Sequence, residues 1–239
     1  MKKNKDTLKA LVTGATRGIG LSISERLIKD GVSVISTGTK ADSFYAKGSE
    51  FIQVDFLDDN SVKEFFRKIE SEDIDILINN AGINRIDEFT NISEKEFDQI
   101  LHVNLRMPFL ISQKVVRTMK ENNWGRIINI ASIFSKVSKE FRASYSVSKF
   151  GLDGLTAAMS AELSQHNILI NTVSPGFVDT DLTRKVLGKA GIEEIIKSVP
   201  SKRLANTEEI SSFVSWLVSE ENTYVSGQNL IIDGGFVRV

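Results

Sequence analysis

The chain has 239 residues, of which 41% are hydrophobic and 26% charged, and its formal net charge is −1. This charge gives no general attraction to nucleic acid or anionic membranes. The absence of cysteine excludes disulfides, thiolate metal sites and cysteine nucleophiles. We find no signal peptide at the Lys-rich start and no run near the roughly 20 apolar residues of a membrane span, so we expect a cytoplasmic protein.

The first predicted element is a buried strand that runs into a glycine-rich turn. Residues 8–20 read LKALVTGATRGIG. Gly14 allows a tight turn, Gly18 lets the backbone approach a phosphate, and Gly20 permits close packing of helix on strand. Unpaired N–H groups and the dipole of the following helix favour an anion there. The spacing Gly-x3-Gly-x-Gly differs by one residue from the usual dinucleotide fingerprint, so a plain turn is the alternative.

Helices and short apolar strands then alternate along the chain. This alternation predicts one α/β domain over 1–239, a doubly wound, seven-stranded parallel sheet with helices on both faces. Strands are expected at 8–12, 32–36, 51–54, 74–78, 125–131, 168–173 and 229–232. Helices are expected at 19–29, 61–70 with Asn60 or Ser61 as cap, 93–120 with a break near Pro108, 144–165, 180–198 in two short segments, and 207–218.

Gly, Asn, Ser and Pro gather where these strands end, at 79–82, 174–176 and 233–235. The carboxyl edge of an open α/β sheet is where ligands bind. We therefore place the functional site at that edge. The loop and helices at 180–200 are expected to form a lid over the substrate.

With the pair Tyr145-x3-Lys149, the pattern is specific enough to compare with a known family. The chain resembles the short-chain dehydrogenase/reductases over nearly its full length. The resemblance rests on Thr13-Gly14-x3-Gly18-Ile19-Gly20, Asn79-Asn80-Ala81-Gly82, Asn104, Ser132, Tyr145-x3-Lys149 and Pro175-Gly176. Residues 173–180 and 233–236 resemble the 3-oxoacyl-[acyl-carrier-protein] reductases in particular. The resemblance implies a Rossmann-type domain, NADP-dependent reduction of a carbonyl to a hydroxyl in fatty-acid biosynthesis, and a homotetramer.

Tyr145 and Lys149 stand about one helical turn apart on one face. A nearby ammonium and a helix N-terminus are expected to lower the pKa of a tyrosine, which can then donate or accept a proton. The resemblance implies that Lys149 also binds the nicotinamide ribose, that Ser132 holds the substrate oxygen, and that Asn104 steadies a water that relays protons from Lys149. The alternatives are surface packing for the Tyr/Lys pair, a cap for Ser132 and backbone bonding for Asn104.

The end of the second predicted strand bears on cofactor choice. It carries Gly38, Thr39 and Lys40 where an Asp or Glu would favour NAD. Arg17 can pair with a 2′-phosphate, so NADP(H) is expected, although solvated surface charge is the alternative for Arg17 and Lys40. The expected cofactor-binding residues are Thr13, Gly14, Thr16, Arg17, Gly18, Ile19, Gly20, Thr39, Lys40, Asp55, Phe56, Asn80, Ala81, Gly82, Tyr145, Lys149, Pro175, Gly176 and Val178, and the expected catalytic residues are Asn104, Ser132, Tyr145 and Lys149.

The substrate is less clearly marked in the sequence. An acidic carrier protein requires a basic landing surface, yet the expected basic positions hold Asn123 and His166. Lys120, Arg126 and Arg184 could compensate. An acyl thioester on the carrier protein is the first expectation, a sugar, polyol or other small alcohol the alternative, and a non-catalytic NADP-binding regulator a third.

Two further classes of site are not expected. The histidines, His102 and His166, lie on separate predicted helices, so no metal site is predicted. No Gly-x-Ser-x-Gly elbow is present, so Ser132 is not interpreted as a hydrolase nucleophile.

Overall fold

The computed structural model describes residues 8–239; the first seven positions of the predicted domain lie outside the described residues. All strands of its seven-stranded sheet are parallel, in the order β3-β2-β1-β4-β5-β6-β7. The order reverses between β1 and β4, which creates a crevice at their carboxyl ends. The predicted doubly wound parallel fold is confirmed. The strands are β1 (Lys9–Val12), β2 (Ser33–Gly38), β3 (Glu50–Gln53), β4 (Ile76–Asn79), β5 (Gly125–Ile130), β6 (Ile168–Pro175) and β7 (Asn229–Ile232).

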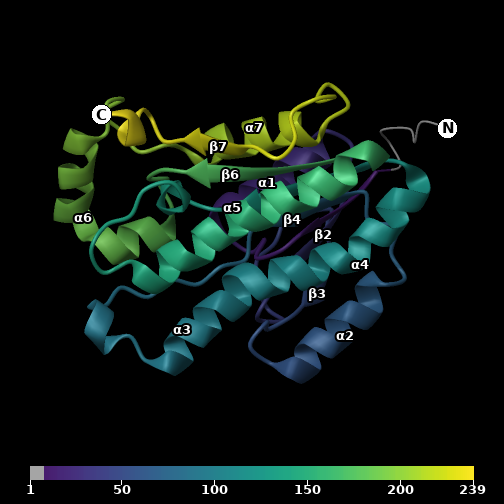
Figure 1. Ribbon diagram of the computed structural model, residues 1–239, viewed down its shortest axis with the longest axis horizontal. Coiled ribbons are helices and arrows are strands. Elements are labelled where there is room, and N and C mark those ends of the chain that lie inside the picture. The colour runs from purple at the N-terminus through teal and green to yellow at the C-terminus, as the bar shows by residue number, and fades with distance from the viewer. Residues whose placement is uncertain (1–7) are drawn as a thin grey trace.

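Helices cover both faces of the sheet (Figure 1). One buried cluster joins alternate strand positions such as Val12 and Ile78 to α1 (Gly18–Lys29) and α7 (Thr207–Val218). The other joins Leu11 and Leu77 to the opposite layer. Successive residues of a strand point to opposite faces, so both faces of this sheet are buried. The second layer contains α2 (Asp59–Ile69), α3 (Glu94–Leu101), α4 (Met107–Asn122) and α5 (Ala143–Leu163).

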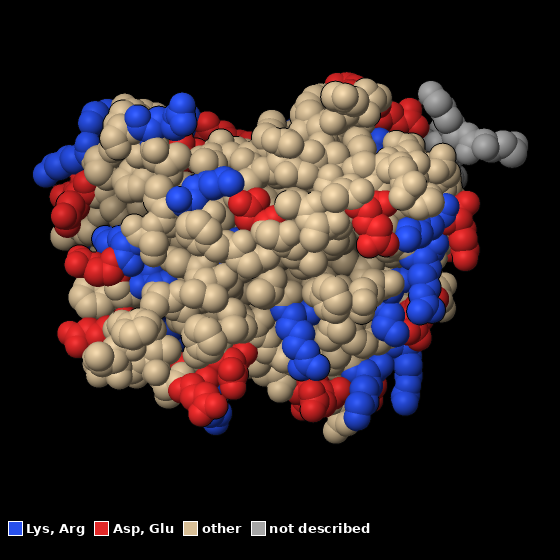
Figure 2. Space-filling model, viewed as in Figure 1, with Lys and Arg blue, Asp and Glu red and all other residues tan. Residues whose placement is uncertain are grey.

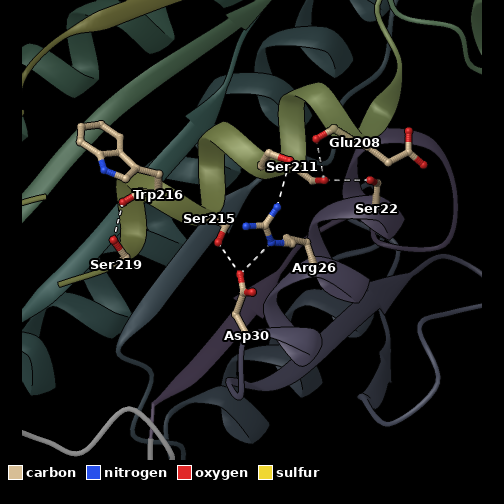
Figure 3. Close-up of polar contacts among 9 residues, drawn as sticks. Ser22, Arg26, Asp30, Glu208, Ser211, Ser215, Trp216 and Ser219 are labelled. Carbon is tan, nitrogen blue, oxygen red and sulfur yellow. Dashed lines mark hydrogen bonds and ion pairs between the residues drawn. The ribbon is translucent and has the colours of Figure 1, made fainter. Parts of the chain in front are cut away.

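Helices α1 and α7 also meet through small polar side chains (Figure 3). The Ser22 hydroxyl donates to Ser211 Oγ at 3.0 Å. The Arg26 guanidinium donates to Asp30 Oδ2 at 2.9 Å, and Ser215 donates to the same carboxylate. Each of these groups has a partner within the chain, so this contact is structural.

The helix that was predicted from 93 to 120 is divided at a different residue. It begins after Ser93, whose hydroxyl and Glu96 form a capping box. A π-helical turn at His102–Arg106 then separates α3 from α4. Pro108 lies in the first turn of α4, where its missing N–H is not needed, so the break expected near Pro108 is present but lies just before the proline, at the π turn. A π turn inserts an extra residue and re-aims its side chains, here those beside the site.

Other boundaries differ by a few residues. Asp58 caps α2, since its carboxylate accepts from the N–H groups of Asn60 and Ser61 at 2.8 Å each. Strand β2 continues through Gly38, two residues past its predicted end. The two predicted segments at 180–198 are confirmed as α6 (Asp181–Ser198), which breaks at Gly188 with φ 62° and ψ 178°. Within residues 8–239, no helix combines the length and apolarity needed to cross a lipid bilayer.

Candidate active site

The glycine turn after β1 is packed directly on the turn after β4. Gly14 and Gly18 have positive φ angles of 63° and 54°, which favour glycine. A Cβ on Gly14 would lie 2.9 Å from Ala81 Cα, and one on Gly20 would lie 2.5 Å from the Gly14 oxygen. The tight turn and the close packing predicted for Gly14 and Gly20 are therefore both present.

Hydrogen bonds join these two turns. Thr13 Oγ1 accepts from the N–H groups of Asn80 and Ala81 at 3.0 Å each. Asn80 Nδ2 donates to the carbonyls of Thr13 and Gly14 at 2.9 Å each. Thr37, which lies in β2 one residue beyond the predicted strand, accepts from the Gly14 N–H through its hydroxyl at 3.2 Å. The crevice at the switch between β1 and β4 thus has a fixed floor.

Polar and cationic side chains border that floor. Arg17 precedes α1, is exposed, and has no ion-pair partner among the described residues. Thr39 and Lys40 are also exposed, directly after β2. The free N–H groups at the start of α1 attract a diphosphate, and an arginine and a lysine at its border attract a further phosphate. The glycine cradle and these cations fit the dinucleotide NADP(H).

Two of the predicted cofactor residues are core side chains. Phe56 is buried against Phe65, with ring centroids 5.8 Å apart, and Val178 packs in the cluster under α7. If these two residues bind the cofactor as predicted, they do so through their backbones. Asp55 is exposed, and its carboxylate accepts from the Leu57 N–H at 2.9 Å.

The remaining predicted cofactor residues lie along the same edge. Gly176 donates its N–H to the Ile232 carbonyl at 2.8 Å and follows the buried Pro175 at the end of β6. Thr16 and Ile19 flank the glycine turn and are half-buried.

Asn104 is 1% exposed and lies on the π turn between α3 and α4. Its Nδ2 donates to the Ile83 carbonyl at 2.9 Å and to Ser148 Oγ at 3.0 Å. Its Oδ1 accepts from the Ile83 N–H at 2.8 Å. Its side chain therefore clamps the loop after β4 to α5. Ser148, which sequence reasoning missed, is recognisable only as the serine beside Lys149.

Tyr145 lies in the first turn of α5, and Ser132 follows β5. Burial raises the pKa of Tyr145, while a hydrogen bond from the Ser132 side chain and the charge of Arg142 oppose that rise. The expected lowering of the Tyr145 pKa is therefore wrong, because desolvation of the phenolate outweighs both favourable groups. Phe134 packs edge-on against Tyr145, with centroids 6.3 Å apart.

Lys149 is 4% exposed and lies one turn along α5. Its Nζ donates to the Ile130 carbonyl at 2.9 Å and lies 5.6 Å from the Tyr145 ring centroid. Burial lowers the pKa of Lys149 to about 8. A Cβ on Gly82 would lie 3.3 Å from Asn104 Oδ1 and 3.7 Å from Lys149 Nζ, so the structure brings these three residues together.

The basic residues expected to attract an acidic carrier protein have other roles. Arg126 is 2% exposed, stacks on Trp124, and donates to the carbonyls of Gly125 and Asn167. Burial lowers its pKa to about 10. A residue so enclosed cannot form a landing surface.

The two others are already paired with carboxylates. Arg184 donates to both oxygens of Asp179, at 2.7 and 2.8 Å, and Lys120 lies 3.5 Å from Glu162. The expected compensation by these cations is not supported. Asn123 ends α4, and His166 lies in the turn after α5.

Across residues 8–239, no group of three or more His, Asp or Glu side chains is arranged to hold a metal ion. His102 Nδ1 lies 3.3 Å from Arg106 Nη1, one turn away on the same helix.

Comparisons with known proteins agree with this geometry. The sequence model of the family described as enoyl-(acyl carrier protein) reductase matches residues 14–237. The 3-oxoacyl-[acyl-carrier-protein] reductase of Aquifex aeolicus is 36% identical over 95% of this chain and 96% of its own. The acetoacetyl-CoA reductase of Cupriavidus necator is 35% identical over 95% and 96%. The solved gluconate 5-dehydrogenase of Burkholderia cenocepacia, in complex with NADP and tartrate, is 28% identical with a TM-score of 0.89, covering 97% of this chain and 96% of that one.

Proposed function

The chain belongs to the short-chain dehydrogenase/reductase family and is an oxidoreductase, and we propose that it reduces the ketone of a 3-oxoacyl thioester with NADPH. The observation that carries this proposal is the meeting of Ser132, Tyr145 and Lys149 at the edge that holds the glycine turn. A hydroxyl and a phenol at one point are suited to hold a carbonyl oxygen and protonate it.

Each residue has a separate task in this reaction. NADPH, when bound on the glycine turn, supplies the hydride for the carbonyl carbon. Tyr145 donates its proton to the carbonyl oxygen, and its raised pKa keeps the phenol in the donating form at neutral pH. Ser132 orients that oxygen from the end of β5. Lys149, with a pKa near 8, is the cation beside the phenol that can restore its proton.

The proposed cofactor is NADP(H) rather than NAD(H). Support comes from Arg17 and Lys40, which are exposed beside the cradle, and from the absence of a carboxylate at Gly38 to Lys40. The Burkholderia enzyme was solved with NADP in the same fold. Replacement of both cations is expected to remove the preference for NADPH.

The thioester is supported by the two relatives of about 35% identity, one named for a carrier-protein substrate and one for a CoA substrate. A groove of about 670 Å³ beside α6 is lined by Ile192, Ile196 and Leu204 together with charged side chains, so only part of its wall suits an acyl chain. The paired cations Arg184 and Lys120 give an acidic carrier little to bind. We therefore place the specificity in the thioester and its acyl chain more than in the carrier.

A second candidate is a sugar-acid dehydrogenase. It is favoured by the likeness to gluconate 5-dehydrogenase and by the ion pair that Arg184 forms with Asp179, which leaves that cation less able to bind an acidic carrier. A regulator without turnover is disfavoured, because such a protein has no use for Asn104, Ser132, Tyr145 and Lys149 at one point.

The proposed architecture is one domain, with residues 180–200 as the lid. Thr180 caps α6, and its methyl group would lie 3.4 Å from a Cβ on Gly18. The lid therefore starts at the cofactor cradle. The break at Gly188 gives it a point at which to bend.

A cytoplasmic homotetramer is also proposed. In Figure 2, viewed as in Figure 1, the middle of the face, over α5 and the start of α4, is mostly uncharged, and charged side chains gather towards the end of α4. Phe109 and Phe150 are 43% and 45% exposed on these helices. Exposed aromatic side chains of this kind suit a subunit interface. Light scattering of the purified protein measures its mass in solution, which should be that of a tetramer.

Steady-state NADPH oxidation tests the proposed reaction. Acetoacetyl-CoA, acetoacetyl-carrier protein and the N-acetylcysteamine thioester are assayed beside 5-ketogluconate. We expect all three thioesters to turn over, with less than tenfold difference between carriers. If 5-ketogluconate is reduced and none of the three thioesters is, the sugar-acid dehydrogenase replaces the thioester reductase as the proposed function.

A further inference from the structure

Arg142 is a half-buried cation with unused hydrogen-bond donors beside the catalytic tyrosine. It precedes the first residue of α5, three positions before Tyr145. Its Nε and Nη1 are both buried, and neither has a hydrogen-bond partner among the described residues. Buried donors in folded proteins are almost always paired, so a site that leaves two unpaired calls for an explanation.

The guanidinium shares a wall of the site with Tyr145. Its Cζ lies 5.7 Å from the centroid of the Phe134 ring, and the same ring packs edge-on against Tyr145. The charge of Arg142 is felt at the phenol, where it favours the phenolate. A group held by Arg142 would therefore lie near the reacting carbonyl.

The backbone is strained where it delivers this side chain. Phe141 has a φ of 64°, a conformation that bulky residues rarely adopt. The Arg142 carbonyl accepts from the Ser146 N–H at 2.7 Å, and Ser138 and Ser146 hydroxyls meet at 2.8 Å. Strained backbone that is held by its surroundings concentrates at ligand sites. The loop is thus built to keep Arg142 in place.

Arg126 shows what a purely structural buried arginine looks like in this chain. Its Nε is also unpaired, but Nη1 and Nη2 donate to three carbonyls, those of Gly125, Asn167 and Asn222. No hydrogen bond or ion pair within residues 8–239 occupies the Arg142 guanidinium, and the neighbouring Glu140 does not pair with it. Arg142 is therefore available for a ligand, and Arg126 is not.

We propose that Arg142 binds a carboxylate on the substrate, so that the same centre also reduces small ketones that carry a free acid group. A guanidinium meets a carboxylate with two parallel hydrogen bonds, and the attraction is strong where water is excluded. This inference rests on the proposed ketone reduction by NADPH.

The reaction balances without a further reagent. The ketone carbon gains a hydride from NADPH and its oxygen gains the Tyr145 proton. The C=O double bond becomes a secondary alcohol, NADPH is oxidised to NADP⁺, and the carboxylate is unchanged.

Matched acid and ester substrates isolate the carboxylate. Pyruvate, acetoacetate and levulinate place a carboxylate at increasing distance from the same methyl ketone, and their methyl esters lack only the charge. We expect the wild type to prefer at least one acid over its ester. Arg142→Gln should reduce that preference for the acid over its ester roughly 100-fold, mainly through KM for the acid. Because both members of a pair share the same ketone and the same Tyr145, any effect of the lost charge on the phenol cancels in this ratio.

Arg142→Lys keeps the charge but loses the two parallel N–H donors of the guanidinium. Its preference for the acid over the ester should lie between those of the wild type and Arg142→Gln. Arg117→Gln, which removes an exposed arginine on α4, controls for the loss of one positive charge. NADPH titration and circular dichroism establish that each variant is folded. Preference for the ester in all three pairs, or an acid preference that survives in Arg142→Gln, would overturn the inference. Absence of thioester turnover in the wild type would instead count against the proposed function.

Discussion

The two ends of the crevice differ in how their polar groups are satisfied. At the cofactor end, Thr13, Thr37 and Asn80 hydrogen-bond to the backbone of neighbouring turns. These hydrogen bonds occupy polar groups of the three side chains within the protein. The N–H groups at the start of α1 remain free to face a ligand. The cofactor end is thus a rigid backbone cradle whose ligand meets mainly main-chain groups.

At the substrate end, several polar side chains are wholly or partly buried although residues 8–239 do not supply a hydrogen-bond partner for every one of their polar atoms. Tyr145 has a raised pKa, Lys149 has a lowered one, and Arg142 has two unpaired nitrogens. The lowered pKa of Lys149 and the unpaired nitrogens of Arg142 cost folding free energy at neutral pH, whereas the raised pKa of Tyr145 does so only at a pH where the unfolded phenol ionises. The scaffold thus completes its own hydrogen bonds at the cofactor end, whereas at the substrate end some polar groups are left to be paired by the ligand.

The largest effect should come from the substrate end. Tyr145→Phe removes the only proposed proton donor and leaves the glycine cradle unchanged. We expect kcat for acetoacetyl-CoA reduction to fall by roughly 10³-fold or more. The Kd for NADPH, measured by fluorescence titration, should change less than about twofold because the phenol contributes little to the cradle. Activity within tenfold of the wild type would remove Tyr145 from the mechanism.

A comparable test of the cofactor end is Gly14→Ala. The new Cβ meets Ala81 Cα at 2.9 Å in a backbone with φ of 63°, so strain and overlap both oppose it. We expect the free energy of unfolding, from urea titration, to fall by about 2–4 kcal/mol.

Gly154→Ala is the matched control for that substitution. Gly154 lies within α5, and a Cβ there meets nothing within 4 Å. Alanine is favoured over glycine inside a helix by up to about 1 kcal/mol, so this variant should be as stable as the wild type or more so. Equal losses in both variants would show that the cradle is looser than its contacts indicate.

Lys149→Met tests whether burial of the Lys149 ammonium lowers the free energy of unfolding. The folded pKa of Lys149 is about 8 and its ordinary value is 10.5, so the folded state holds its proton less tightly than the unfolded state. The contribution of Lys149 to the free energy of unfolding is therefore lowest below pH 8 and rises as the pH increases from 8 to 10.5. At pH 7 we expect the variant to be more stable by about 1–3 kcal/mol, although inactive.

That advantage should shrink as pH rises through the same window. Urea titrations at pH 7, 8.5 and 10 measure the difference in unfolding free energy. A pH-independent difference, or a variant that is less stable at pH 7, would mean that the bond from Lys149 Nζ to the Ile130 carbonyl outweighs burial.

The fold was predictable because its signals are local and repeated. Apolar runs such as Leu11–Val12 and Ile76–Ile78 alternate with helical periods, and the structure has a strand or helix at each predicted place. The differences arise where two signals compete. Pro108 indicated a break, but proline is tolerated in the first turn of a helix, and the real discontinuity is a π turn without a distinctive sequence.

The positions of the candidate site residues were predictable from the sequence, but their electrostatics were not. Spacing alone put Tyr145 and Lys149 on one face, as the structure has them. The sign of the Tyr145 pKa shift depends on burial by residues distant in sequence, which spacing does not reveal. Arg142 was missed for the same reason: an arginine before a helix is ordinary, and only its burial without partners makes it unusual.

Arg17 is the exception at the cofactor end, and it gives the last prediction. Unlike Thr13 and Asn80 it is exposed, and like that of Arg142 its side chain has no hydrogen-bond or ion-pair partner within residues 8–239. We therefore expect Arg17 to bind a ligand group, the 2′-phosphate. We expect Arg17→Ser with Lys40→Ser to raise KM for NADPH by roughly 10- to 100-fold, because each charged hydrogen bond contributes about 1.5–3 kcal/mol at most and solvent weakens exposed ones.

The KM for NADH, which lacks that phosphate, should stay within about twofold, and the NADPH effect should weaken as salt rises to 0.5 M. Arg117→Ser controls for loss of charge far from the cradle. If the double variant still prefers NADPH over NADH, these two cations are ordinary surface charges and the preference lies in the backbone of the cradle. In that case no side-chain cation at the cofactor end would be needed for binding, and of the two arginines only Arg142, at the substrate end, would remain as a proposed ligand-binding group.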